Sequence, residues 1–234
     1  MEKIKEEVPE KLRIAVLLSF ISGYINAFTY NNAGELFAGA QTGNVIFMAL
    51  HFAKGNLEKA VEFLIPIISF MIGQIFIYCF RNFFQRRGHK GYIHSSLLML
   101  FIMIMLIVLL PFFDYHFIVV TLAFFAAIQS DTFQRLRGFS YATIMMTGNV
   151  KNAPRLLIEG LVQRDRELLV RGFLLFLIIF SFMLGVGIST YFTQFVKKSA
   201  LVLLILPLSY INYVLFKEEH NVIDVVKSKI RKIK

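Results

Sequence analysis

Long apolar runs constrain this chain more than any other feature of its sequence. Residues 92–113 form a run of 22 residues without a formal charge, and residues 199–216 form another of 18. A helix of about 20 such residues crosses the hydrocarbon core of a bilayer. Charged residues make up 17% of the chain, whereas they supply about a quarter of a soluble domain. The sequence therefore predicts an all-α membrane protein.

The reactive residue types argue against an enzyme. Cys79 is the single cysteine, and the five histidines lack the spacing of a metal site. We find no phosphate-binding glycine loop, no nucleophile motif and no pair of carboxylates within the apolar runs. The sequence therefore predicts no catalytic residue, no metal ion and no cofactor.

Six segments are expected to cross the membrane: residues 14–30, 60–80, 92–113, 115–133, 172–192 and 199–216. Two others, residues 37–53 and 139–150, each contain Thr-Gly-Asn, and the second is too short and polar to cross. Cytoplasmic loops are rich in Lys and Arg. Six spans leave 21 of these residues inside and 4 outside, whereas eight spans leave 17 and 8. We therefore expect six spans with both termini in the cytoplasm.

The net charge of +10 does not indicate nucleic acid as a partner, because the basic residues lie between the spans. Anionic headgroups of the lipid bilayer are the expected partners of these loops and of the basic tail at residues 227–234.

The two Thr-Gly-Asn segments belong to an internal repeat. A shift of 105 residues aligns residues 42–45 with residues 147–150, and it aligns Asn26 with Asp131. A shift of 112 residues aligns the pentapeptide that begins at Ser69 with the one that begins at Ser181. Each half, residues 1–113 and 114–234, then holds three spans, and this odd number predicts inverted repeats. The alternative is chance similarity within an apolar chain.

Thr-Gly-Asn predicts a broken or re-entrant helix in residues 37–53 and in residues 139–163. Glycine readily ends a helix in the left-handed conformation, and asparagine is a good helix N-cap. In the second copy, Pro154 is expected to shorten or restart the helix. A break within a membrane is tolerated where protein or a hydrated cavity satisfies the backbone. Two breaks could therefore form a site for a polar or anionic solute, and the alternative is that both stabilise buried turns.

The candidate solute-binding residues belong to the two motifs and to neighbouring spans: Thr42, Gly43, Asn44, Thr147, Gly148, Asn149, Asn26 and Gln129. Asp131 is the candidate for proton or ion coupling, because acids inside membranes often lie on ion pathways. A local ion pair with Arg135 is the alternative for Asp131. Core hydrogen bonding is the alternative for Gln129.

The chain resembles the YoaK family of bacterial membrane proteins, a group of unknown function. Two stretches carry the resemblance: "SGYINAFTYNNAGELFAGAQTGNVIFMAL" at residues 22–50, and "AAIQSDTFQ" at residues 126–134 followed by "TIMMTGNV" at residues 143–150. The resemblance covers nearly the whole chain and implies a protein of the bacterial inner membrane. Asn26 departs from it, since the family usually has an acid there, and Ser130 and Asp131 replace a more usual Asn-Ala.

These features together predict a small-solute transporter or channel, and they leave a homo-oligomer open. The alternative is a non-transporting membrane scaffold or regulator that acts through contacts between helices.

Overall fold

The structure is a computed structural model, and it describes residues 8–217. The basic tail at residues 227–234 lies outside the described residues. The predicted all-α fold is confirmed. The first half contains η1 (Val8–Glu10), α1 (Leu12–Asn32), α2 (Gln41–Ala53), α3 (Leu57–Arg86) and α4 (Gly91–Leu109). The second half contains α5 (Tyr115–Thr132), β1 (Arg135–Leu136), β2 (Phe139–Ser140), α6 (Met146–Gln163), α7 (Arg166–Val196), η2 (Lys197–Leu204) and a last helical stretch at residues 205–217.

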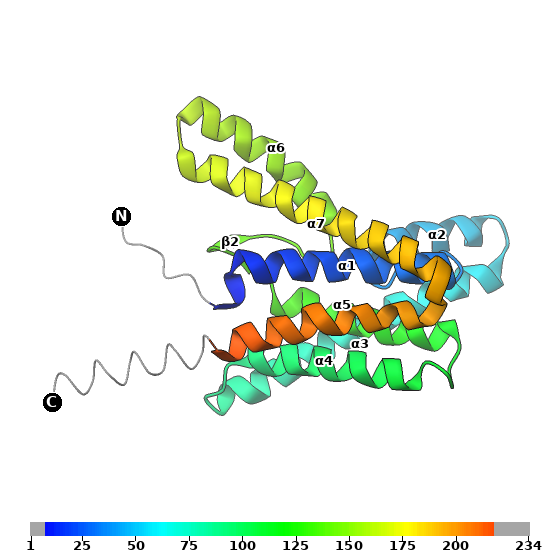
Figure 1. The fold of residues 1–234 in the computed structure, drawn as a ribbon. Coiled ribbons are helices and arrows are strands. Elements are labelled where there is room, and N and C mark those ends of the chain that lie inside the picture. Colours follow the sequence, from blue (N-terminus) through cyan, green and yellow to red (C-terminus); the bar gives the residue numbers. More distant parts are fainter. Residues whose placement is uncertain (1–7, 218–234) are drawn as a thin grey trace.

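Four helical segments of the described chain are long and apolar enough to cross a membrane. They are α1, α3, α4 and residues 166–217. The last of these reverses direction at Lys197, which has a φ of 48°, so α7 and the last helical stretch lie side by side with the other long helices (Figure 1). Helix α5 was also predicted to span but is not among the four. It has only 18 residues and is polar at both ends, with Tyr115 and His116 at its start and Gln129, Ser130 and Asp131 near its end. The length and apolar character of these four segments therefore support a membrane protein.

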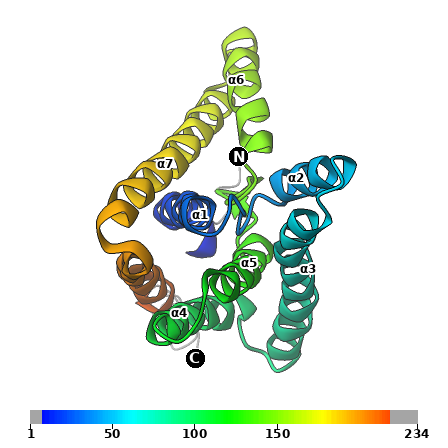
Figure 2. The ribbon, with the colours of Figure 1, turned by 90° about the vertical axis from the view of Figure 1, so that its right-hand side faces the viewer.

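Helices α1 and α5 lie at the centre of the bundle, with α7 beyond α1 and α3 beyond α5 (Figure 2). In α1, 72% of the most apolar 18-residue stretch is buried inside the protein, against 28% of the corresponding stretch in each of the other three segments. The outer helices leave large apolar side chains exposed, among them Ile72, Phe101 and Phe180. An exposed apolar surface of this extent suits contact with lipid and not with water.

Small residues allow the central helices to approach closely. A β-carbon at Gly23 on α1 would clash with the main-chain carbonyl of Phe182 on α7. A β-carbon at Gly73 on α3 would lie 2.6 Å from the β-carbon of Ala127 on α5. Helices in membranes associate largely through such close packing, because lipid provides no hydrophobic drive between them. The glycines therefore fix the positions of α7 on α1 and of α3 on α5.

Two serine hydroxyls reinforce these contacts in the same way. Ser69 on α3 donates a hydrogen bond to the main-chain oxygen of Val120 on α5 at 2.7 Å. Ser181 on α7 donates one to the main-chain oxygen of Val16 on α1, also at 2.7 Å. Ser69 and Ser181 are the two residues that the shift of 112 aligns. The outer helix of each pair is therefore held by an equivalent side chain.

The only strands in residues 8–217 form a short hairpin between α5 and α6, which the sequence analysis did not predict. Arg137 and Gly138 occupy its turn with φ values of 47° and 82°, as a two-residue turn with positive φ at both positions requires. The main-chain N–H of Gly138 donates to Glu10 Oε2 at 2.7 Å. The hairpin is thereby tied to η1 at the start of α1.

Candidate solute site

Each Thr-Gly-Asn motif lies in the first turn of a helix and follows a non-helical stretch. We call residues 36–40 the first approach segment and residues 141–145 the second approach segment. Helix α2 begins at Gln41 and helix α6 at Met146, and neither helix has a side-chain N-cap. The prediction that glycine ends one half-helix and asparagine caps the next is therefore wrong. Gly43 and Gly148 have ordinary helical φ values, and α6 continues through Pro154 as one helix of 18 residues.

The asparagine of each motif binds the approach segment that precedes it. Asn44 Oδ1 accepts from the N–H of Phe37 at 2.9 Å, and its Nδ2 donates to the oxygen of Phe37 at 2.8 Å. Asn149 makes the same two bonds to Ala142, at 3.2 and 2.7 Å. Both side chains are buried. The asparagines therefore satisfy backbone groups that leave the helix, and their polar atoms are used in doing so.

The two approach segments contact each other at the centre of the bundle. A β-carbon at Gly39 would lie 2.5 Å from Cγ2 of Ile144 and 3.5 Å from the β-carbon of Ala126 on α5. Gly39 and Ile144 are related by the shift of 105 residues. The absence of a side chain at Gly39 therefore lets the segments meet.

Helix α1 anchors the first approach segment. Asn26 Oδ1 accepts from the N–H groups of Gly39 and Ala40 at 2.9 and 3.0 Å. Thr29 Oγ1 accepts from the N–H of Ala38 at 3.1 Å. Asn26 is 3% exposed, and its Nδ2 donates to the main-chain oxygen of Ser22 at 2.8 Å. Three consecutive N–H groups before α2 are thus satisfied by side chains of α1.

The second approach segment lacks these bonds. Within residues 8–217, the main-chain N–H groups of Thr143, Ile144 and Met145 have no acceptor. A cavity of about 340 Å³ lies beside them, which we call the motif cavity. It is lined by Ser130, Gln134, Ser140, Tyr141, Ala142, Thr143, Met145, Gly148, Asn149 and Asn152. No formally charged side chain is among these residues.

Two buried hydroxyl groups belong to the lining of the motif cavity. Thr143 is 2% exposed and Tyr141 is 6% exposed, and neither hydroxyl has a hydrogen-bond partner in the described part of the chain. Buried polar atoms in native proteins usually have a partner in the protein, in ordered water or in a ligand. The hydroxyls of Tyr141 and Thr143 are therefore unused hydrogen-bonding groups in residues that line the motif cavity.

One comparison with known proteins identifies a family. The family described as "Protein of unknown function (DUF1275)" matches residues 14–214. The chain belongs to the DUF1275 family. The YoaK group is part of DUF1275, so the predicted resemblance is confirmed. No curated protein and no solved structure matches the chain. Because DUF1275 carries no assigned function, the activity has to be inferred from the geometry.

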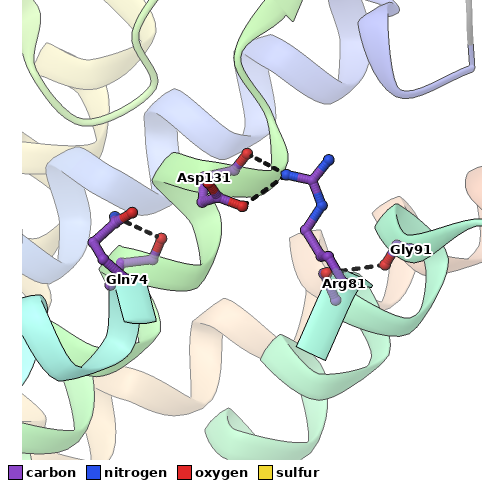
Figure 3. A network of polar contacts seen from close by, with 6 residues as sticks. Gln74, Arg81, Gly91 and Asp131 are labelled. Atoms are coloured by element: carbon purple, nitrogen blue, oxygen red, sulfur yellow. Dashed lines mark hydrogen bonds and ion pairs between the residues drawn. The ribbon is translucent and has the colours of Figure 1, made fainter. Parts of the chain in front are cut away.

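In this DUF1275 member, Asp131 lies outside the motif cavity and forms an ion pair (Figure 3). Arg81 Nη1 on α3 lies 2.7 Å from Asp131 Oδ2 and donates to the main-chain oxygen of Asp131 at 2.8 Å. Arg81 therefore takes the place of the predicted local partner Arg135. About two turns earlier on α3, Gln74 Nε2 donates to the main-chain oxygen of Ala127 at 3.1 Å (Figure 3). These contacts bind the end of α3 to the end of α5.

The other candidate residues of this DUF1275 chain fall into two groups. Gln129 is fully buried and donates to the oxygen of Leu18 at 3.0 Å and to Ser22 Oγ at 2.6 Å, so it joins α5 to α1. Thr42 and Thr147 are exposed on the first turns of α2 and α6. Of the two motif glycines, only Gly148 lines the motif cavity, and a β-carbon there would meet nothing within 4 Å.

Sequence reasoning missed Tyr141, Thr143, Ser130 and Gln134, which line the motif cavity. Their signal was weak, because isolated hydroxyl and amide residues around a loop are common in any protein. Tyr141 and Thr143 combine a place in the cavity lining with a buried hydroxyl that has no hydrogen-bond partner in the described chain, and this combination appears only in three dimensions.

Proposed function

We propose that this protein is a small-solute transporter of the bacterial inner membrane, built from two inverted repeats at residues 1–113 and 114–234. Three observations support the repeat. Asn44 and Asn149 make the same pair of bonds, each to the residue seven positions before it. Ser69 and Ser181 make the same contact between helices. Finally, Gly39 contacts its own counterpart, as equivalent residues do where a two-fold axis passes between them.

In the proposed topology α2 and α6 are re-entrant. Both begin where the approach segments meet, and Figure 1 shows them extending toward opposite ends of the bundle. The six spans would be α1, α3, α4, α5, α7 and residues 197–217. The connection from α3 to α4, with Arg87 and Lys90, and the turn from α6 to α7, with Arg164, lie toward the same end of the bundle (Figure 1). That end would face the cytoplasm and its anionic headgroups.

The motif cavity is the single observation that carries the transport proposal. It lies between the end of α5 and the start of α6, and its lining includes Tyr141 and Thr143, whose buried hydroxyls have no partner in the described chain. The equivalent position in the first half is closed, because Asn26 holds Gly39 and Ala40. In an alternating-access cycle, this arrangement corresponds to one state of the transporter. The solute would enter the motif cavity from the end of α5, and the equivalent position beside the first approach segment would be closed.

We also propose a coupling role for the Arg81–Asp131 pair. It fixes α3 to α5 beside a second cavity of about 230 Å³. Protonation of the Asp131 carboxylate would remove its negative charge and weaken its attraction for Arg81. Because α3 could then separate from α5 at this end, proton binding would favour opening. Asp131 would act in this way on the helices and not on the solute itself.

Solute flux into proteoliposomes tests the transport proposal. We would measure stopped-flow light scattering after mixing with glycerol, urea, glycine or sodium acetate. We expect at least one solute to enter faster than into protein-free liposomes. Gly148→Leu should abolish this gain, because it fills the motif cavity without a clash at the β-carbon. Gly187→Leu is the matched control, since Gly187 is exposed on α7 and also has nothing within 4 Å.

Two results would overturn the proposal. Equal flux with and without protein for every solute would favour the scaffold alternative, which predicts a stable partner on purification. Flux that persists unchanged in Gly148→Leu would place the pathway away from the motif cavity.

A further inference from the structure

The two halves differ in how the N–H groups before the short helix are satisfied. In the first half, one oxygen atom, Asn26 Oδ1, accepts from two consecutive N–H groups. The shift of 105 residues relates Gly39 and Ala40 to Ile144 and Met145. In the described chain the N–H groups of these two counterparts have no acceptor. The second half therefore has the two N–H donors that correspond to those of Gly39 and Ala40, but it has no side-chain oxygen that accepts from them.

The side chain that could have supplied this oxygen is engaged elsewhere. Asp131 is the sequence counterpart of Asn26, but its carboxylate pairs with Arg81 at 2.7 Å. Asp131 lines the second cavity with Arg81, and only its neighbour Ser130 lines the motif cavity. The ion pair thus holds the counterpart carboxylate away from the approach segment.

The remaining groups around the motif cavity favour binding of a negatively charged ligand. Helix α6 has 18 residues and begins at Met146 without a side-chain cap, so its first N–H groups carry partial positive charge toward this end. The buried hydroxyl of Thr143 supplies a further donor without a partner. No Asp or Glu lines the cavity, so nothing there would repel an anion at close range.

We propose that the motif cavity binds the carboxylate group of a small organic acid. One carboxylate oxygen accepts from the N–H of Met145, the counterpart of the Ala40 N–H that Asn26 Oδ1 binds in the first half. The other accepts from the hydroxyl of Thr143, which is covered in this structure and reaches the cavity by rotation of its side chain. The cavity of about 340 Å³ has room for an acid of a few carbon atoms. The inference rests on the proposed transport function, because it names the class of solute.

Binding of acetate and of acetamide to the purified full-length protein tests this inference. The two probes have nearly the same shape, and only acetate is charged. We would measure saturation-transfer NMR at constant ionic strength, with sodium chloride as the balancing salt. We expect acetate to bind at least about tenfold more tightly than acetamide, because hydrogen bonds to a charged acceptor are the stronger ones.

Variants locate the site. Thr143→Val keeps the shape of the side chain and removes its hydroxyl, so it should weaken acetate binding about tenfold. Thr143→Ser restores a hydroxyl and should recover most of the affinity. Gly148→Leu should abolish binding, and Gly187→Leu should leave it unchanged.

Several results would overturn the inference: no acetate binding, equal binding of acetamide, or acetate binding that Thr143→Val and Gly148→Leu leave unchanged. Its failure is distinguishable from failure of the transport proposal. If glycerol or urea flux is blocked by Gly148→Leu while acetate does not bind, the protein transports a neutral solute and only the carboxylate inference is wrong. If acetate binds but no solute enters liposomes, the transport proposal fails.

Discussion

Gly39 and Ile144 contact each other where the two approach segments meet. A β-carbon added at Gly39 would lie only 2.5 Å from Cγ2 of Ile144. The contact joins residues 105 positions apart that occupy equivalent places before α2 and α6. A larger side chain at this contact would push the two approach segments apart.

Gly39→Val should destabilise the protein by about 1–3 kcal/mol, because overpacking a tight contact displaces its neighbours. Ile144→Ala should cost stability alone but recover part of the loss in the double variant, since it removes the atom that the introduced valine side chain would strike. A double-mutant cycle on thermal unfolding in detergent measures this coupling. Strictly additive effects would show that the two segments do not touch.

Removing the asparagine side chain in either half should have similar effects. Asn44→Ala and Asn149→Ala each leave a part-buried main-chain N–H and C=O without their partner, at a cost of about 1–3 kcal/mol. The exposed neighbours provide controls, and Thr42→Ala and Thr147→Ala should stay within about 0.5 kcal/mol of the natural protein. A loss in the controls as large as in the asparagine variants would contradict this division of roles.

Arg81 and not Arg135 should be coupled energetically to Asp131. The side chains of Arg81 and Asp131 are 28% and 22% exposed, so solvent weakens their attraction only in part. A cycle of Arg81→Gln and Asp131→Asn should give a coupling of about 0.5–3 kcal/mol. The same cycle with Arg135→Gln should give none beyond error, and the reverse result would restore the local ion pair.

The packing of α7 on α1 should depend on which glycine of α7 is changed. Gly185→Ala brings a β-carbon against the main chain of Phe20, so it should cost about 1–3 kcal/mol. Gly187→Ala is two residues away and meets nothing within 4 Å, so it should be neutral or slightly stabilising. Melting temperatures in the same detergent compare the two, and equal values would place the helix contact elsewhere.

The start of α5 should respond to acid. Asp114 Oδ1 accepts from the N–H of Phe117 at 3.1 Å, and this bond lowers the pKa of the carboxyl below its ordinary value of 3.8. A lowered folded-state pKa means that the stabilisation is present at neutral pH and is lost as the pH falls through that pKa. Asp114→Asn should therefore flatten the pH dependence of the melting temperature below about pH 4. An unchanged profile would assign the acid sensitivity to other carboxyl groups.

The sequence was informative where a property repeats along the chain. Apolar runs predicted the long helices, because burial in lipid requires apolar residues at nearly every position of a span. The position of Thr-Gly-Asn was misjudged, since local propensity favours a helix stop at glycine. In the structure Asn44 reaches back seven residues to Phe37, and this tertiary bond allows the helix to start before the motif.

Partners distant in sequence were beyond such reasoning. Spacing along a helix suggested Arg135 for Asp131, but Arg81 lies 50 residues away and is brought close only by the packing of α3 on α5. The unsatisfied N–H groups of the second approach segment could not be predicted either, because whether an N–H has an acceptor depends on the residues that pack around it in the fold. Thr143 reads as an ordinary loop residue until its burial is known.

The packing of α1 against α7 also has a consequence for biosynthesis. Val16 accepts its bond from Ser181, which follows 165 residues later in the chain. At roughly 5–20 residues per second, the ribosome needs about 10–30 s to produce that partner. Throughout this interval the first helix, with Asn26 and other polar side chains that it later buries, has no α7 to cover it. Contacts between α1 and α7 can therefore form only after the second half has been made, so the native packing around the first helix is completed late.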